Sequence, residues 1–238
     1  MMDEQHLSIL HGDLPADAID IWHLDLNEER ADWDVLDEEE RTRAQRIRVP
    51  DKRVQFVSAR SQVRYILASY LGCRPDAVRF GYGDHGKPFL LFDPDLVINI
   101  SHSHQAGLLA VTVGSDQTLG IDIELNKPGR RFEAIATRFF SEQEHRALLA
   151  LSLGDRPAAF YRAWTRKEAY LKAWGTGLSF PSNRFTVSFD RAGRSELLAS
   201  EMPGEGGQTW HFHEIRASHG HLAALCYPGT ERWLRHYA

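Results

Sequence analysis

The amino-acid sequence predicts an α+β fold made of two similar halves, each a long helix packed on a small, mostly antiparallel sheet. The first observation is that both halves carry the same order of elements: a long helix, a glycine and then three strand-like segments. The second is that these strands follow one another directly instead of alternating with helices, which argues against a doubly wound parallel sheet. We therefore expect an internal duplication with halves at residues 1–116 and 117–238.

In the first half, a helix is expected over residues 52–71, because apolar residues recur there at spacings of three and four and Gly72 follows as a stop. The recurring apolar positions are Phe56, Ala59, Val63, Ile66 and Tyr70. Strand-like segments come next at 78–82, 96–100 and 108–113.

The second half repeats this order. Ser141 and Glu144 have the spacing of a capping box that opens a helix. Asp155 is then expected to cap a longer helix that runs to about Trp174 and ends at Gly175. Three further strands are predicted at 185–189, 209–215 and 222–227.

The composition excludes several classes of protein. The chain has 238 residues and a formal net charge of −5, which argues against a bulk nucleic-acid binder. Its acidic start lacks the flank and apolar stretch of a signal peptide, and its longest apolar run, near 106–113, is far shorter than the ~20 residues that span a bilayer. Because Cys73 and Cys226 are too few for a disulfide scaffold, a cytoplasmic protein is expected.

Charges near the start are segregated. Residues 28–40 hold eight acids and one base, whereas residues 41–64 hold eight bases and one acid. One interpretation is a helix over 37–49 whose charges complement its own dipole. The other is an anion site formed by arginines. Its members would be Arg41, Arg43, Arg46 and Arg48.

Residues 81–86 match G-x-G-x-x-G after a strand, but a dinucleotide site needs a helix to open there. Pro88 and an apolar run follow instead, so a glycine-rich turn presenting Lys87 is what remains, and such a lysine is commonly just solvated. Further on, Ser101 and His102 stand where a buried strand passes into small polar residues. Both offer donors to a phosphate, although a capped loop would look the same.

Acidic and apolar residues alternate strictly at 119–124. A period of two puts Asp122 and Glu124 on one face of a strand and the isoleucines on the other. Such a face is commonly solvated. If it is enclosed, two close carboxylates need a proton or a cation between them, and ligation by oxygen alone favours Mg²⁺.

The predicted helix that ends near Trp174 carries Glu168 and Lys172 one turn apart, with Trp164 a turn before them on the same face. An i, i+4 pair of this kind is ordinary helix stabilisation. Beside an aromatic side chain it can instead be partly buried. Glu168 is then a candidate metal ligand or general base, and Lys172 a candidate to neutralise charge on a phosphate.

Five motifs, taken in this order, resemble those of the 4′-phosphopantetheinyl transferases of the surfactin-synthetase-activating type. They are GKPFL at 86–90, INISHS at 98–103, GIDIE at 120–124, RFFSEQE at 138–144 and WTRKEAYLKAWGTGL at 164–178. Each motif is modest alone, but five in the right order are specific. The preceding arginine-rich helix pair also resembles that of the family.

The resemblance implies an enzyme that moves the phosphopantetheine arm of coenzyme A onto a serine of an acyl or peptidyl carrier protein and releases adenosine 3′,5′-bisphosphate. It also implies a pseudo-twofold α+β fold with the active site between the two halves. No nucleic-acid or membrane partner is expected, and two halves in one chain make a monomer sufficient.

Carried over residue by residue, the resemblance implies that Asp122, Glu124 and Glu168 hold Mg²⁺ against the pyrophosphate of coenzyme A, with Lys172 on the same phosphate. Glu168 is also the candidate general base. Three residues fall where the family binds the nucleotide and its phosphates, namely Lys87, Ser101 and His102. Arg43 falls where a basic residue meets the 3′-phosphate, a match that rests on helix register and can shift to Arg41 or Arg46.

Two alternatives remain at this point. A Mg²⁺-dependent nucleotide phosphohydrolase would use the same metal, lysine and phosphate donors, but it would need only water as acceptor. A non-enzymatic protein that binds coenzyme A is the other, although it would not need the full set of carboxylates and lysine.

Overall fold

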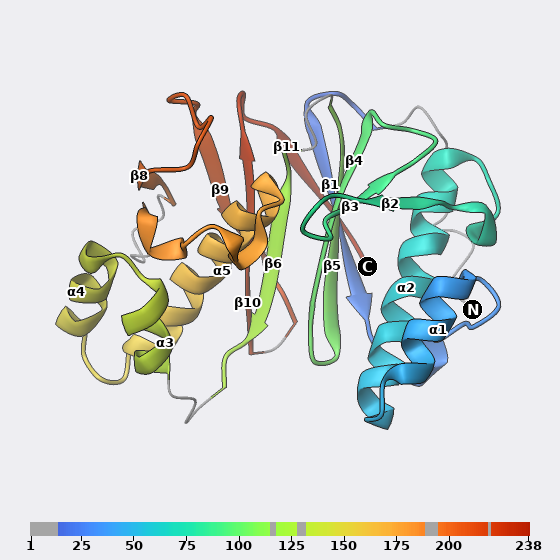
Figure 1. The fold of residues 1–238 in the computed structure, drawn as a ribbon, viewed down its shortest axis with the longest axis horizontal. Coiled ribbons are helices and arrows are strands. Elements are labelled where there is room, and N and C mark those ends of the chain that lie inside the picture. Colours follow the sequence, from blue (N-terminus) through green and yellow to red (C-terminus); the bar gives the residue numbers. More distant parts are fainter. Residues whose placement is uncertain (1–13, 115–117, 128–131, 189–194, 219) are drawn as a thin grey trace. The chain divides into compact units, whose positions relative to one another are not determined.

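The computed structural model describes residues 14–114, 118–127, 132–188, 195–218 and 220–238. They form two compact units (Figure 1). The first unit contains residues 14–81, 88–114 and 232–238, and the second contains residues 82–87 and the described residues from 118 to 231. In the described part of the chain, no helix is long and apolar enough to cross a membrane.

The first unit is built on a four-stranded sheet in the order β11-β1-β5-β4. Its strands are β1 (Ala18–Asp25), β4 (Leu96–Ser103), β5 (Ala106–Val113) and β11 (Trp233–Tyr237). β1 runs parallel to β11 and antiparallel to β5, and β4 is antiparallel to β5. A separate two-stranded sheet pairs β2 (Phe80–Tyr82) with β3 (Pro88–Leu90).

The long helix α2 (Pro50–Leu71) supplies one side of the core of the first unit. Val63 and Ile66 on this helix belong to one buried cluster with Trp22 of β1 and Leu109 of β5. The helix ends because Gly72 adopts a left-handed conformation, with φ of 61°. Two short 3-10 helices lie before and after it, η2 (Glu28–Arg30) and η3 (Pro75–Ala77).

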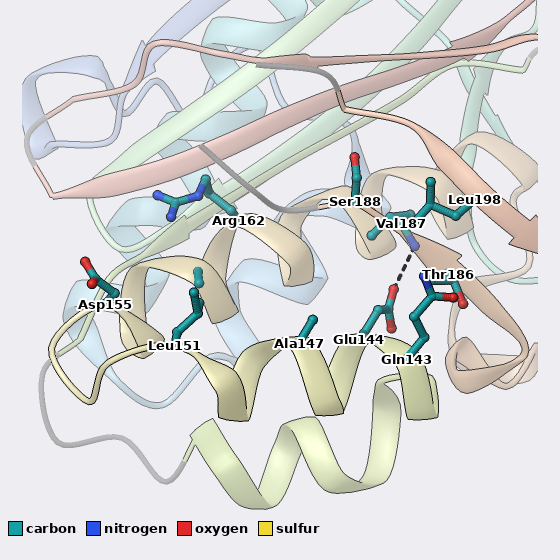
Figure 2. Close-up of a pocket in the computed structure, with 11 residues that line it drawn as sticks. Gln143, Glu144, Ala147, Leu151, Asp155, Arg162, Thr186, Val187, Ser188 and Leu198 are labelled. Atoms are coloured by element: carbon teal, nitrogen blue, oxygen red, sulfur yellow. Dashed lines mark hydrogen bonds between the residues drawn. The ribbon is translucent and has the colours of Figure 1, made fainter. Parts of the chain in front are cut away.

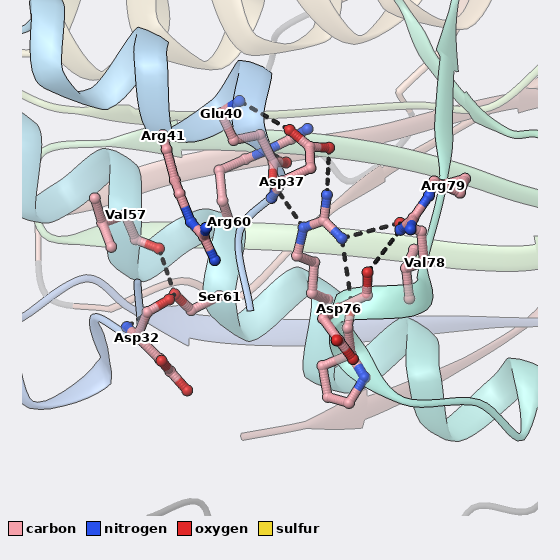
Figure 3. Close-up of polar contacts among 12 residues, drawn as sticks. Asp32, Asp37, Glu40, Arg41, Val57, Arg60, Ser61, Asp76, Val78 and Arg79 are labelled. Atoms are coloured by element: carbon pink, nitrogen blue, oxygen red, sulfur yellow. Dashed lines mark hydrogen bonds and ion pairs between the residues drawn. The ribbon is translucent and has the colours of Figure 1, made fainter. Parts of the chain in front are cut away.

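A buried network of charges fixes α1 (Glu38–Arg46) against α2 (Figure 3). The Glu40 carboxylate accepts hydrogen bonds from Arg60 Nε at 2.5 Å and Arg64 Nε at 2.7 Å. Arg64 has no exposed surface and also pairs with Asp37, the N-cap of α1, at 2.5 Å. Some of the segregated acids and bases of the sequence therefore pair with one another, and these pairs hold the two helices together.

The second unit is built on the antiparallel sheet β6-β10-β9 and the helix α5 (Arg156–Trp174). Its strands are β6 (Gly120–Leu125), β9 (Trp210–Glu214) and β10 (His221–Pro228). Ala169 and Tyr170 of α5 share a buried cluster with Phe212 of β9 and Ala224 of β10. The remaining elements are α3 (Phe132–Phe139), α4 (Glu142–Ala150), η4 (Gly177–Ser179), η5 (Ser182–Arg184) and the hairpin of β7 (Phe185–Val187) with β8 (Leu197–Ser200).

The predicted fold class is confirmed: both units are a long helix packed on a small, mostly antiparallel sheet. Ser141 and Glu144 form the predicted capping box, and Gly175 ends α5 in a left-handed conformation. Asp155 stands at the N-cap of α5 but makes no capping hydrogen bond from its side chain, since it accepts one from Ser152 Oγ. Residues 81–86 lead into β3 and no helix opens there, as the sequence predicted.

Candidate active site

The acidic motif lies on β6, which packs directly against α5. Ile121 and Ile123 are buried on one face of the strand, as the period of two predicted. On the other face, Gly120 lies so close to the helix that a Cβ added there would stand 1.9 Å from the carbonyl oxygen of Ala169. Asp122 shares that face and is 5% exposed. Asp122 therefore faces the helix and not open solvent.

Lys172 reaches this face from the last turn of α5. Its Nζ donates to Asp122 Oδ1 at 2.7 Å and to the carbonyl oxygen of Ile121 at 3.2 Å. The lysine side chain is 28% exposed, so the residue is not sealed off from solvent. The two residues are 50 positions apart in the sequence, and packing of the helix on the strand brings them together.

Glu168 lies one turn before Lys172 on the same helix and is partly buried. The pKa of its carboxyl is raised to about 7, chiefly by burial and next by the Asp122 carboxylate, while Lys172 opposes the rise and Glu124 adds to it. This shift indicates that three carboxylates act on one another in a confined space. Such mutual repulsion is relieved by a proton or by a cation.

The chemistry of this donor set fits Mg²⁺, because Asp122, Glu124 and Glu168 offer only oxygen atoms and Mg²⁺ prefers oxygen ligands. In the part of the chain that the structure describes, no three acidic, histidine or cysteine side chains are already grouped to hold a metal. The ammonium group of Lys172 neutralises Asp122 instead. Substrate oxygens and water would have to complete the coordination of a bound Mg²⁺.

A buried ion pair anchors the middle of α5 next to Glu168. Lys167 Nζ donates to both oxygens of Glu144, at 2.7 and 2.9 Å, and to the carbonyl oxygen of Phe185 at 2.8 Å. Burial lowers the pKa of Lys167 to about 8, and the neighbouring carboxylate opposes that effect. Glu144 and Lys167 lie in the motifs RFFSEQE and WTRKEAYLKAWGTGL, but neither motif contains a local signal that the two residues pair.

Lys87 also reaches the end of α5. It closes the glycine-rich turn, where its carbonyl oxygen accepts a hydrogen bond from the backbone N–H of Gly83. Its Nζ donates to the carbonyl oxygen of Ala173 at 2.8 Å. Two of the predicted phosphate-binding lysines, Lys87 and Lys172, therefore meet the same last turn of one helix.

The other predicted ligand-binding residues belong to the first unit. Ser101 and His102 are neighbours near the end of β4, and Ser101 is buried whereas His102 is exposed. On α1, the guanidinium group of Arg43 lies 5.2 Å from the centre of the Phe56 ring and is otherwise exposed. Arg41 instead donates to two backbone carbonyl oxygens, those of Trp33 and Asp34. Arg41 is thus bound to the protein backbone, although its side chain is exposed.

Comparisons with known proteins give consistent matches. A family model described as the 4′-phosphopantetheinyl transferase superfamily matches residues 118–226. The 4′-phosphopantetheinyl transferase HetI from Nostoc sp. is 35% identical over 173 residues, covering 70% of this chain and 72% of that protein. The 4′-phosphopantetheinyl transferase Sfp from Bacillus subtilis is 32% identical over 164 residues, covering 69% of each chain.

Among solved structures, a holo-(acyl-carrier-protein) synthase from Bacillus anthracis in complex with CoA superposes with a TM-score of 0.37 and 24% identity. The superposition covers 48% of this chain and 96% of that chain.

Proposed function

The chain belongs to the 4′-phosphopantetheinyl transferase superfamily, and we propose that it moves the phosphopantetheine arm of coenzyme A onto a serine of an apo acyl or peptidyl carrier protein. Adenosine 3′,5′-bisphosphate is the second product. The observation that carries this proposal is the ion pair of Lys172 with Asp122 beside the partly buried Glu168. This arrangement places a cation that can bind phosphate next to carboxylates that can hold a metal ion.

We assign Asp122, Glu124 and Glu168 as the residues that hold Mg²⁺. Their all-oxygen donor set and their mutual repulsion support this assignment. When bound, Mg²⁺ would neutralise charge on the pyrophosphate of coenzyme A. Lys172, which is not sealed off from solvent, would contact the same phosphate.

In the reaction, the oxygen of the carrier serine attacks the β-phosphorus of coenzyme A and forms a new P–O bond. The bond from that phosphorus to the bridging oxygen breaks, and its electron pair stays with the departing adenosine 3′,5′-bisphosphate. Glu168 takes the serine proton, directly or through a water. Lys172 stabilises the negative charge that the leaving phosphate gains, which makes Glu168 and Lys172 the catalytic pair of this scheme.

For the rest of coenzyme A, we assign Lys87, Ser101 and His102 to the nucleotide and its phosphates. Lys87 is supported by its place at the same helix end as Lys172. We assign Arg43 to the 3′-phosphate on the helix register of the family resemblance. Its side chain is exposed, as is that of the alternative Arg46, whereas Arg41 donates to backbone carbonyl oxygens.

The enzyme is proposed to work as a monomer in the cytoplasm, without nucleic-acid or membrane partners. Its two cysteines, Cys73 and Cys226, are both free thiols, in keeping with a reducing compartment.

The proposal is tested by incubating the protein with coenzyme A, Mg²⁺ and several apo carrier proteins, and measuring the intact mass of each carrier. At least one carrier should gain the mass of phosphopantetheine, and a chelator should abolish that gain. If no carrier gains it while coenzyme A is hydrolysed, the protein is a phosphohydrolase. If transfer continues in chelator, Mg²⁺ has no part in it.

A further inference from the structure

A cavity apart from the candidate active site lies in the second unit, between α4, the first half of α5 and the β7–β8 hairpin (Figure 2). Its volume is about 420 Å³. This lies within the range of roughly 300–1,000 Å³ that is usual for small-ligand pockets. Neither the carboxylates on β6 nor Lys172 lines it.

Five of the eleven residues that line this pocket are aliphatic, and most of its surface is apolar. Ala159 and Val187 are buried at its base, and Leu198, which is 47% exposed, stands at its rim. Ala147 points into it from α4, and Leu151 follows at the end of that helix (Figure 2). A ligand that binds this wall must be largely apolar, because the burial of hydrocarbon surface is what would favour its binding here.

Three charged side chains also line the pocket, and two of them have partners within the protein. Glu144 is neutralised by Lys167 and accepts a hydrogen bond from the backbone N–H of Val187. Asp155 accepts one from Ser152 Oγ.

Arg162 is the third charged side chain, and it differs from the other two. Its Nε is buried and has no hydrogen-bond partner in the described part of the chain. Its guanidinium group forms no ion pair with the described residues either. The pocket is therefore lined by a cation that no described carboxylate neutralises. A buried donor left without an acceptor is unfavourable, so an anionic group that reaches it is favoured.

We propose that this pocket binds an alkyl carboxylate, with the hydrocarbon chain against the aliphatic wall and the carboxylate on Arg162. Guanidinium and carboxylate groups match in a planar, two-bond arrangement, which favours this headgroup over an alcohol or an amine. The site is independent of the transferase reaction, because it uses none of the residues assigned to coenzyme A or Mg²⁺.

Calorimetric titration of the full-length protein with decanoate tests the proposal. Saturable binding is expected for decanoate, with much weaker binding for decanol, which lacks the charge, and for acetate, which lacks the chain. Equal binding of decanoate and decanol would overturn the assignment of the headgroup. The absence of saturable binding by decanoate would overturn the site.

Two variants then place the ligand. Arg162→Leu should weaken decanoate binding about tenfold or more while leaving decanol unchanged. Ala147→Trp should fill the cavity and abolish the binding of both. Arg146→Leu is the matched control, because its side chain is 73% exposed on α4 and does not line the pocket. Thermal melting of each variant shows that it is folded, and unchanged decanoate binding in both folded variants would contradict the proposal.

Discussion

Replacing Glu144 by glutamine removes the charge that neutralises Lys167 in the interior of the second unit. The side chains of both residues are 1% exposed, and the carboxylate accepts four hydrogen bonds. Two come from Lys167 and the others from the backbone N–H groups of Ser141 and Val187, at 2.7 and 2.8 Å. Breaking a buried pair by removing one partner costs ~3–5 kcal/mol, because the other charge stays buried.

For a chain of this size, each kcal/mol shifts the melting temperature by roughly 2–4 °C. We therefore expect Glu144→Gln to lower it by roughly 6–20 °C. Glu142→Gln is the matched control on the same helix, since its carboxylate is 84% exposed and pairs with Arg146 at 3.5 Å. That exposed pair contributes about 0–1 kcal/mol.

The assay is urea unfolding followed by hydrogen exchange of the amides of the second unit, which separates its stability from that of the first. A double variant, Glu144→Gln with Lys167→Met, should recover much of the loss, because it leaves no unpaired charge and the glutamine oxygen can still accept from a backbone N–H group. The reasoning is refuted if Glu144→Gln behaves like Glu142→Gln, or if the double variant is as unstable as both losses added together.

Three further predictions concern single positions. Gly120→Ala places a Cβ 1.9 Å from a backbone oxygen of α5, so it should cost about 3 kcal/mol or more in urea unfolding. Gly154→Ala, where nothing lies within 4 Å, should cost far less, and similar values for the two alanine variants would contradict the account. Arg235→Met removes a guanidinium group that donates to the fully buried Asp20 at 2.6 and 2.9 Å. We expect the free energy of unfolding to fall by ~3–5 kcal/mol. A fall of less than about 1 kcal/mol would show that this pair does not fix β11. Burial and a neighbouring imidazole lower the pKa of His23 below its ordinary 6.5, so the folded state binds its proton less readily than the unfolded chain does. The contribution of His23 to the free energy of unfolding should be fully present above about pH 6.5 and should be lost as the pH falls below that value. His23→Gln should reduce this loss in thermal melts recorded across the same pH range. An unchanged pH profile in the variant would show that His23 does not cause the loss.

Local patterns predicted the elements that carry the candidate site, but not how they meet. The alternation at 119–124 placed Asp122 and Glu124 on one face of a strand, yet only the close approach of α5 at Gly120 shows that the face is covered. No local rule pairs Asp122 with Lys172, because their contact spans 50 positions. The residues of the turn before Pro88 likewise do not predict that Lys87 donates to a backbone carbonyl oxygen at the end of α5.

The strands β1 and β11 of the first sheet were not predicted from the sequence, for a related reason. Strand β1 carries Asp20 at a buried position, and an acid interrupts the apolar pattern by which strands are recognised. Its partner Arg235 lies 215 positions away on β11, which runs parallel to β1. A pairing between the two ends of a chain leaves no local signal in either segment.

The most direct test of the central claim is the rate of a single round of phosphopantetheine transfer to an apo carrier, measured by intact mass at saturating coenzyme A and Mg²⁺. Relative to wild type, Asp122→Asn and Lys172→Met should each slow this step by about a hundredfold or more. Glu142→Gln, on the exposed face of α4, should not slow it. Folded Asp122→Asn and Lys172→Met proteins that transfer at the wild-type rate would contradict the assignment of this site.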